Sequence, residues 1–170
     1  MTALEAAKLF RQTLGHYPTG VCVIAARDDQ GRAEGMTVGT FSSVSLEPPL
    51  VGFLPSKIST SWPQIERVGR FCANVLSSEQ GWLCQRFASQ IDDKFDGVAY
   101  SLSPGGQPIL ADAVAWIDCT IYSVHEAGDH LFVLGEVDAH DAKHGALPLL
   151  FFRGQYGRFA PLPSLAGGAA

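Results

Sequence analysis

The stretch AVAWIDCTIYSVHEAGDHLFVLGEVDAH, residues 113–140, contains two long strand-like runs on either side of EAGD at residues 126–129. Both runs are rich in β-branched and aromatic residues, and a glycine–aspartate turn between two such runs is a strong hairpin signal. The stretch therefore predicts a pair of long antiparallel strands, around which the rest of the fold has to be built.

Shorter strand-like runs flank this hairpin in both directions. Further strands are expected at residues 19–27, 33–45, 49–55, 70–77, 147–154 and 155–161. Helices are expected at residues 3–15, 59–69 and 78–89, the last with Ser78 in the capping position, and residues 90–108 are expected to form a loop-rich excursion. Many short strands joined mostly by hairpins, with few helices, predict an antiparallel barrel or sandwich. The chain has no strand-to-helix GxGxxG or GxxxxGK[ST] element, so any nucleotide must be held without a Rossmann or P-loop cradle.

The length of 170 residues suits one domain, expected over residues 1–160, with a flexible tail at residues 161–170. Hydrophobic residues make up 46% of the chain and charged residues 17%, which leaves little charged surface for a free monomer and indicates a buried subunit interface. The formal net charge is -5 and no run of Lys or Arg occurs, so nucleic acid is not an expected partner.

The first 20 residues lack the basic start and long apolar run of a signal peptide, and no stretch approaches the roughly 18 apolar residues of a membrane span. A cytoplasmic location without a membrane partner is therefore expected. Cys22, Cys72, Cys84 and Cys119 are scattered among apolar neighbours, which favours reduced core thiols over disulfides. The histidines show no ligand-type spacing with acids or cysteines, so no metal site is expected.

A second stretch, GMTVGTFSSVSLEPPL at residues 35–50, concentrates hydroxyl side chains where a strand is also expected. Hydroxyls and backbone N–H groups can satisfy a phosphate in a partly buried site, and small residues let the backbone approach a flat ring. Taken alone, the same composition suits ordinary strand residues on a solvated face. The surrounding motifs have to decide between these two interpretations.

Those motifs are YPTGVCVIAA, GMTVGTFSSVSLEPPLV, SKISTSWP, RFCANVLS, QRFA, DDKFDGV, GDHLFVLGEV and LLFFRGQYGRF, which run from about Phe10 to Phe159. In this order and spacing the chain resembles the flavin reductase family of FMN-binding split barrels, the small reductase components of two-component flavin monooxygenases. The resemblance implies a mainly β fold, an antiparallel split barrel with a few flanking helices. It also favours the phosphate-binding interpretation of residues 35–50.

The resemblance further implies a homodimer that uses NADH or NADPH to reduce FMN or FAD, which then diffuses to a separate oxygenase. No Arg/Lys cluster marks a pocket for a 2′-phosphate, which favours NADH. Hydride passes between the two cofactors, so no catalytic side chain is expected.

By the same resemblance, the flavin is expected to be held mainly by the segment at residues 36–43 and by the SKISTS loop. The matching residues are Met36, Thr37, Val38, Ser42, Ser43, Lys57, Ser59 and Ser61. Further candidates for cofactor contact are Asn74, Arg86, Lys94, Phe95 and Tyr156. His130 matches a histidine on the nicotinamide side of the flavin.

Several of these residues also have a structural interpretation, which stays open at this point. Lys57 can be a solvated loop lysine, and Lys94 can belong to an exposed loop in which it pairs with neighbouring aspartates. Asn74 can bond to nearby backbone, since an unpaired buried amide costs on the order of 1–3 kcal/mol. Phe95 can anchor its loop, His130 can simply be exposed, and Tyr156 can serve packing or dimer contacts.

Two other functions are compatible with the barrel. One is a flavin oxidase similar to the pyridoxamine-phosphate oxidases, and the other is a non-catalytic protein that binds or stores FMN. The order of the motifs, above all GDH and SVSLEPPL, favours a reductase over the oxidase. Storage uses the same hydroxyl-rich segment, so only reduction of bound flavin by NADH separates it from a reductase.

Overall fold

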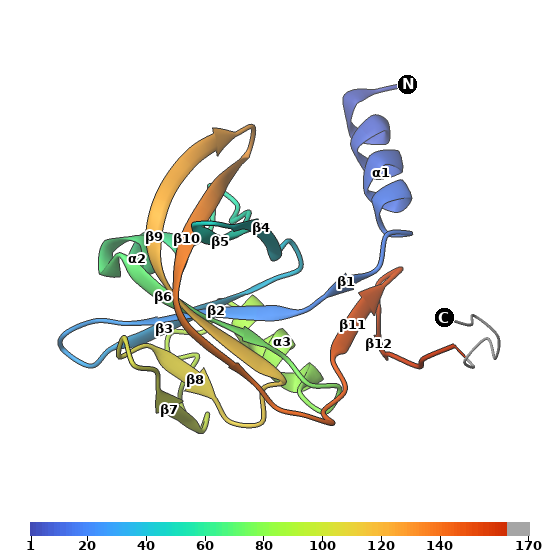
Figure 1. Ribbon diagram of the computed structural model, residues 1–170. Helices are drawn as coiled ribbons and strands as arrows, with labels where there is room; N and C mark the ends of the chain where they lie inside the picture. Colours follow the sequence, from blue (N-terminus) through green and yellow to red (C-terminus); the bar gives the residue numbers. More distant parts are fainter. Residues whose placement is uncertain (163–170) are drawn as a thin grey trace.

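A computed structural model describes residues 1–162 (Figure 1). The described residues form the helices α1 (Ala3–Leu14), α2 (Trp62–Val68) and α3 (Gly81–Ala88). The strands of the first half are β1 (Thr19–Gly20), β2 (Cys22–Arg27), β3 (Ala33–Val38), β4 (Ser42–Leu46), β5 (Pro49–Phe53) and β6 (Arg70–Val75). Those of the second half are β7 (Tyr100–Leu102), β8 (Pro108–Leu110), β9 (Ala115–Ala127), β10 (His130–Ala142), β11 (Leu149–Phe152) and β12 (Gln155–Arg158).

The main sheet has seven strands in the order β3-β2-β6-β9-β10-β5-β4. Every adjacent pair in it is antiparallel, and the β9–β10 hairpin supplies its two longest strands. A three-stranded sheet β1-β11-β12 and a two-stranded sheet β7-β8 complete the strands of residues 1–162. The mainly β, antiparallel fold with a few helices is thereby confirmed. Within the described residues, the edge strands β3 and β4 do not pair with each other, so the curved sheet stays open.

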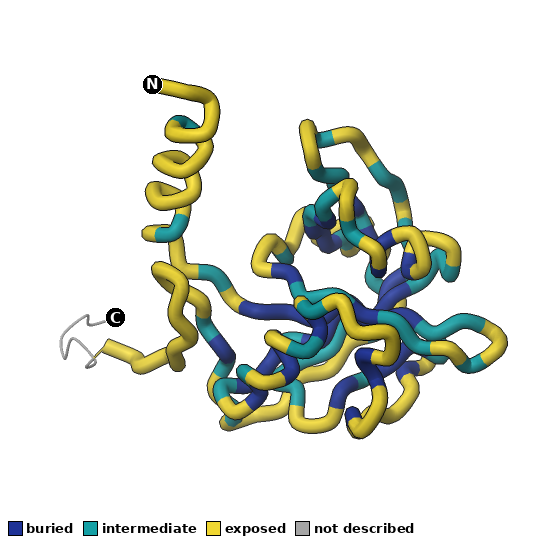
Figure 2. The backbone as a smooth tube through the Cα atoms, turned by 180° about the vertical axis from the view of Figure 1, so that it is seen from behind, coloured by how far each residue is buried: buried dark blue, intermediate teal, exposed yellow. Residues whose placement is uncertain are grey.

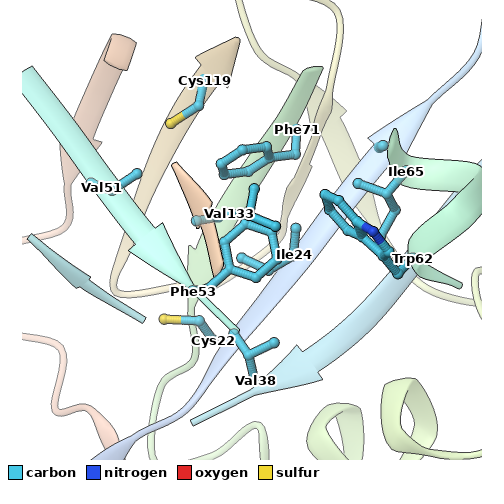
Figure 3. Close-up of a cluster of buried hydrophobic side chains, with 12 residues drawn as sticks. Cys22, Ile24, Val38, Val51, Phe53, Trp62, Ile65, Phe71, Cys119 and Val133 are labelled. Carbon is cyan, nitrogen blue, oxygen red and sulfur yellow. The ribbon is translucent and has the colours of Figure 1, made fainter. Parts of the chain in front are cut away.

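Both faces of the centre of this sheet are buried. Along β2, Cys22 and Ile24 point into one apolar cluster, whereas Val23 and Ala25 point into another. The first cluster lies inside the curve of the sheet, where Phe53 packs edge-on against Phe71 at a centroid distance of 5.2 Å (Figure 3). Burial on both faces explains why this part of the sequence is a continuous apolar run and not an alternating one.

α1 and the β11–β12 hairpin project away from this body (Figure 1). A capping box starts α1, because Thr2 Oγ1 accepts from the Glu5 backbone N–H while the Glu5 carboxylate accepts from the Thr2 N–H. The helix nevertheless has no buried residue, and it is almost entirely exposed in Figure 2. Leu4, Phe10 and Leu14 are among the large apolar side chains that it leaves in solvent.

The structure corrects three local expectations. Residues 33–45 form two strands and not one, because β3 pairs with β2 while β4 pairs with β5 at the other end of the sheet. Ser78 does not cap α3: the N-cap is Gln80, and the Ser78 hydroxyl donates instead to the Glu79 carboxylate. The excursion at residues 90–108 contains β7 and the start of β8, which form a short hairpin.

Two other expectations concern the ends of the fold and the membrane. The expected tail, residues 161–170, lies outside the described residues apart from its first two positions, Pro161 and Leu162. None of the helices formed by residues 1–162 has the length and apolar character needed to cross a membrane.

Candidate functional site

Thr37 and Val38 of the expected cofactor segment border a cavity of about 270 Å³, whereas Met36 packs against the first apolar cluster. The lining residues come from four parts of the chain and are Thr19, Val21, Thr37, Val38, Gly39, Cys84, Phe151 and Tyr156. Because β3 is an edge strand, alternate backbone N–H and C=O groups along it have no strand partner on its outer side. The cavity thus brings Thr37, Val38 and Tyr156 together beside free backbone groups.

Two hydrogen bonds at this cavity converge on Cys84. The Thr37 hydroxyl donates to the Cys84 carbonyl oxygen at 2.9 Å, and the Tyr156 hydroxyl donates to Cys84 Sγ at 3.1 Å. The bond to Cys84, with a smaller contribution from burial, raises the pKa of Tyr156 to about 12. The single O–H of the phenol is thus already donated to Cys84, and its oxygen can accept a hydrogen bond at the edge of a bound ring.

Ser42 and Ser43 begin β4, the other edge of the main sheet, and both are exposed. The Ser42 hydroxyl donates to the Ser43 carbonyl oxygen at 3.1 Å. Thr40, between the two edge strands, accepts a hydrogen bond from the Leu54 N–H at 2.9 Å. Ser42 and Ser43 therefore offer accessible hydroxyls. The Thr40 hydroxyl is already engaged by the Leu54 N–H and stabilises the turn that precedes β4.

The SKISTS loop lies beside the tip of the β9–β10 hairpin. Ser56 forms an isolated β-bridge with His130, and the Lys57 N–H donates to the Asp129 carbonyl oxygen at 3.0 Å. The Lys57 ammonium pairs with the Glu126 carboxylate. His130 Nδ1 lies 2.7 Å from the Asp129 carboxylate, and this bond holds the pKa of Asp129 below its ordinary value. The fold therefore brings Lys57 and His130 to one end of the molecule, although 72 residues separate them in the chain.

Ser59 and Ser61 stand at the start of α2. The Ser59 hydroxyl accepts a hydrogen bond from the Trp62 N–H at 3.2 Å, which satisfies one free donor of the first turn. Ser61 is buried and accepts a hydrogen bond from the Lys94 ammonium at 2.7 Å. Of these two hydroxyls, Ser59 is the accessible one.

The other basic candidate, Arg86, forms its bonds with the loop that carries Lys94. The guanidinium donates to the carbonyl oxygens of Asp93, Lys94 and Asp96 at 2.6–3.3 Å. Phe95 is buried and packs edge-on against Phe87 at 5.0 Å. These contacts fit the structural interpretation of Phe95 as the anchor of its loop.

Asn74 is completely buried and is the last but one residue of β6. Its amide nitrogen is within bonding distance of three backbone carbonyl oxygens, and the Pro108 oxygen at 3.0 Å is the nearest. Its carbonyl oxygen accepts from the Leu110 N–H at 2.8 Å. This full set of partners favours the structural interpretation, in which Asn74 holds the β7–β8 hairpin against the main sheet.

The residue that sequence reasoning missed is Cys84. All four cysteines are free and buried, as expected for core thiols. Burial raises the pKa values of Cys22 and Cys72 to about 12 and that of Cys119 further still. Cys84 differs from them because it also lines the cavity and receives the Tyr156 hydrogen bond, and no spacing signal in the sequence marks this position. Within residues 1–162, no group of three or more His, Cys, Asp or Glu side chains is arranged to hold a metal ion.

The chemistry of the lining suits a flavin. Val21, Val38 and Phe151 provide apolar walls for a flat ring, while Thr37 and Tyr156 place polar groups at its edges. The exposed hydroxyls of β4 and of the SKISTS loop are suited to phosphate oxygens.

Comparisons with known proteins agree with this chemistry. The family model described as a flavin reductase like domain matches residues 14–160. A flavin reductase from Pseudomonas putida is 56% identical over 153 residues, which cover 90% of each chain. The reductase subunit HsaB of a flavin-dependent monooxygenase from Rhodococcus jostii is 47% identical over 152 residues, or 89% of this chain and 77% of the relative.

A solved structure gives the same result at the level of the fold. The NADH:FAD oxidoreductase SgcE6 of Streptomyces globisporus C-1027, in complex with NAD and FAD fragments, superposes with a TM-score of 0.87. It is 33% identical in sequence, and the match covers 95% of this chain and 97% of the other.

Proposed function

Because the chain belongs to the flavin reductase family, we propose that it transfers hydride from NADH to FMN or FAD and passes the reduced flavin to a separate monooxygenase. It is an NAD(P)H-dependent flavin oxidoreductase. The observation that carries the proposal is the cavity beside Thr37 and Val38, where an edge strand, apolar walls and polar edges meet. The name of the Rhodococcus jostii relative, the reductase subunit of a flavin-dependent monooxygenase, supports the monooxygenase partner.

A bound flavin would supply the redox chemistry, as the acceptor of hydride from the nicotinamide. The protein has to hold the rings, exclude water and stabilise negative charge. Val21, Val38 and Phe151 give the cavity apolar walls, against which a flat ring would displace water. Backbone N–H groups of Met36–Val38 are proposed to stabilise the charge that develops at the edge of the ring. The remaining proposed flavin contacts are Ser42, Ser43, Lys57, Ser59 and Arg86, with Tyr156 at the ring edge.

The direct test is anaerobic. Purified protein is mixed with excess FMN or FAD, NADH or NADPH is added, and the visible absorbance of the flavin is followed. Rapid bleaching with NADH and slower bleaching with NADPH is the expected result. Flavin that binds but stays oxidised with both nucleotides would favour an oxidase or an FMN-storage protein.

Replacing Ser42 by aspartate is expected to weaken FMN binding by roughly tenfold, because a carboxylate would face the phosphate. Isothermal titration with FMN and with riboflavin, which lacks the phosphate, measures the effect. Riboflavin affinity should stay unchanged. Ser101→Asp on β7 adds the same charge at another exposed strand position and serves as the control. Equal FMN affinity in Ser42→Asp and the wild type would remove Ser42 from the site.

Replacing His130 by alanine is expected to raise the KM for NADH several-fold and to leave flavin affinity nearly constant. The reason is that His130 sits at the tip of the β9–β10 hairpin, the proposed nicotinamide side of the site. Steady-state kinetics and a flavin titration on the same preparation separate the two effects. His140→Ala, at an exposed position on the same strand, is the control. A drop in flavin affinity with a constant KM for NADH would place His130 on the other cofactor.

We also propose that the protein is a homodimer in which α1 and the β11–β12 hairpin contact a second copy. α1 has no buried residue in the isolated chain, and its apolar side chains include Leu4, Phe10 and Leu14. Phe151 in β11 and Phe159 directly after β12 add exposed aromatic area on the hairpin. A cytoplasmic location is proposed as well, because the four cysteines are free thiols.

Light scattering after size exclusion tests the dimer. The wild type should have twice the mass of the 18.2 kDa chain, and the double variant Phe10→Glu, Leu14→Glu should move toward the monomer. Lys8→Glu changes charge on the same helix without removing apolar area and should remain dimeric. A monomeric wild type at micromolar concentration would contradict the proposal.

A further inference from the structure

The ammonium group of Lys94 is buried and fully hydrogen-bonded. The residue is only 7% exposed, and Nζ donates to the Gly35 carbonyl oxygen at 3.1 Å, to Ser61 Oγ at 2.7 Å and to the Phe87 carbonyl oxygen at 3.3 Å. An ammonium group has three donors, and here each of them has an acceptor. No donor is left over to bind a phosphate directly.

The positive charge is balanced inside the protein. The Glu34 carboxylate, itself largely buried, lies 3.7 Å from Nζ. Glu34 is in turn held by the Gly35 N–H at 2.9 Å and by the Gln64 amide at 3.2 Å. A buried charge needs both a counter-charge and hydrogen bonds, and Lys94 has them from residues of its own chain.

The three acceptors belong to three different parts of the candidate site. Gly35 directly precedes Met36–Val38, the segment whose Thr37 and Val38 border the cavity. Ser61 is the N-cap of α2 and ends the SKISTS loop. Phe87 lies in the last turn of α3, the helix that carries Cys84. One side chain therefore connects the cofactor strand, the hydroxyl-rich loop and the helix behind the cavity.

We propose that Lys94 is a positioning residue for the flavin site: it acts through Gly35, Ser61 and Phe87 to set the place of Met36–Val38 and does not touch the phosphate. The inference rests on the proposed function, because it names which chain segments the flavin needs in place. Its consequence is specific. Loss of Lys94 should weaken the binding of any flavin by the same factor, whether or not the flavin carries a phosphate.

The test compares FMN with riboflavin in Lys94→Met, which keeps an unbranched side chain one atom shorter and removes the charge and the donors. Both affinities are expected to fall about tenfold or more and by equal factors, while far-ultraviolet circular dichroism shows a folded protein. A loss confined to FMN would make Lys94 a direct phosphate ligand and would overturn the proposal. Unchanged affinities with a lower melting temperature would also overturn it, since that pattern marks a purely structural lysine.

Two further variants keep the test decisive if Lys94→Met does not fold. Ser61→Ala removes one acceptor of the ammonium and should also weaken FMN and riboflavin equally, though by a smaller factor; a loss for FMN alone would overturn the proposal. Lys143→Met removes a lysine whose side chain is 60% exposed and should change neither affinity. Reduction of bound flavin by NADH, measured on the wild type, tests the proposed function independently of the role of Lys94. Flavin that binds without reduction by NADH contradicts the reductase, and the ratio of the two affinity losses still decides the role of Lys94.

Discussion

Replacing Asn74 by leucine is expected to lower the free energy of unfolding by about 3–5 kcal/mol. The substitution leaves the Leu110 N–H without its acceptor and removes the nearest donor from the Pro108 carbonyl oxygen. Each buried polar group left unsatisfied costs about 1–3 kcal/mol, and the leucine side chain has no partner for either group. Urea denaturation at one fixed protein concentration measures the change, because a dimer makes stability depend on concentration.

Gln30→Leu is the matched control for Asn74→Leu. It also replaces an amide by leucine, but in the exposed turn between β2 and β3, and it should change stability by less than about 0.5 kcal/mol. A loss below about 1 kcal/mol in Asn74→Leu would mean that water reaches the β6–β8 contact and replaces the amide. The predicted role of Asn74 as the link to the β7–β8 hairpin would then be wrong.

Replacing Gly135 by alanine is expected to cost about 2–3 kcal/mol of stability. A Cβ at this position would lie 2.5 Å from Cζ of Phe71 and 3.1 Å from Cβ of Cys119. Phe71 has no exposed surface and packs against Phe53, so its ring has little room to move. Forcing an extra methyl into a packed core typically costs about 1–3 kcal/mol, and this contact is among the tightest around any glycine of the described chain.

Gly81→Ala provides the contrast for Gly135→Ala, since nothing lies within 4 Å of a Cβ placed on Gly81. Gly81 starts α3, where alanine is a better helix former, so the variant should be neutral or up to about 1 kcal/mol more stable. Thermal unfolding of both variants at the same concentration gives the comparison. Equal stability of Gly135→Ala and the wild type would show that the Phe71 ring can move aside at no cost.

The main strands could be predicted because their signals are local. The EAGD turn between two β-branched runs specifies the β9–β10 hairpin, whatever surrounds it. The hydrophobic stripe and the glycine at residue 15 likewise specify α1 within one residue of its observed end. The order of the motifs predicted membership of the flavin reductase family, and the comparisons confirm that prediction.

Several features of the site had no local signal. The break between β3 and β4 depends on which strand each half pairs with, and the two halves join opposite edges of the sheet. The short β7–β8 hairpin depends on partners such as Asn74, 34 residues before Pro108 in sequence. From the sequence, Cys84 is indistinguishable from the other core thiols. Its role depends on Tyr156, which lies 72 residues further along the chain and donates a hydrogen bond to it in the fold.

The environment of Lys94 could not be predicted from its neighbours in the sequence. In DDKFDGV the lysine stands among three aspartates, a composition that suits an exposed loop with local ion pairs. In the fold its charge faces Glu34, and its donors reach Gly35, Ser61 and Phe87. The sequence by itself determined the antiparallel strands, the helices and the family, because these follow from short-range patterns and motif order. Only the tertiary structure decided which polar groups are buried and paired, because burial depends on residues that are distant in the chain and close in space.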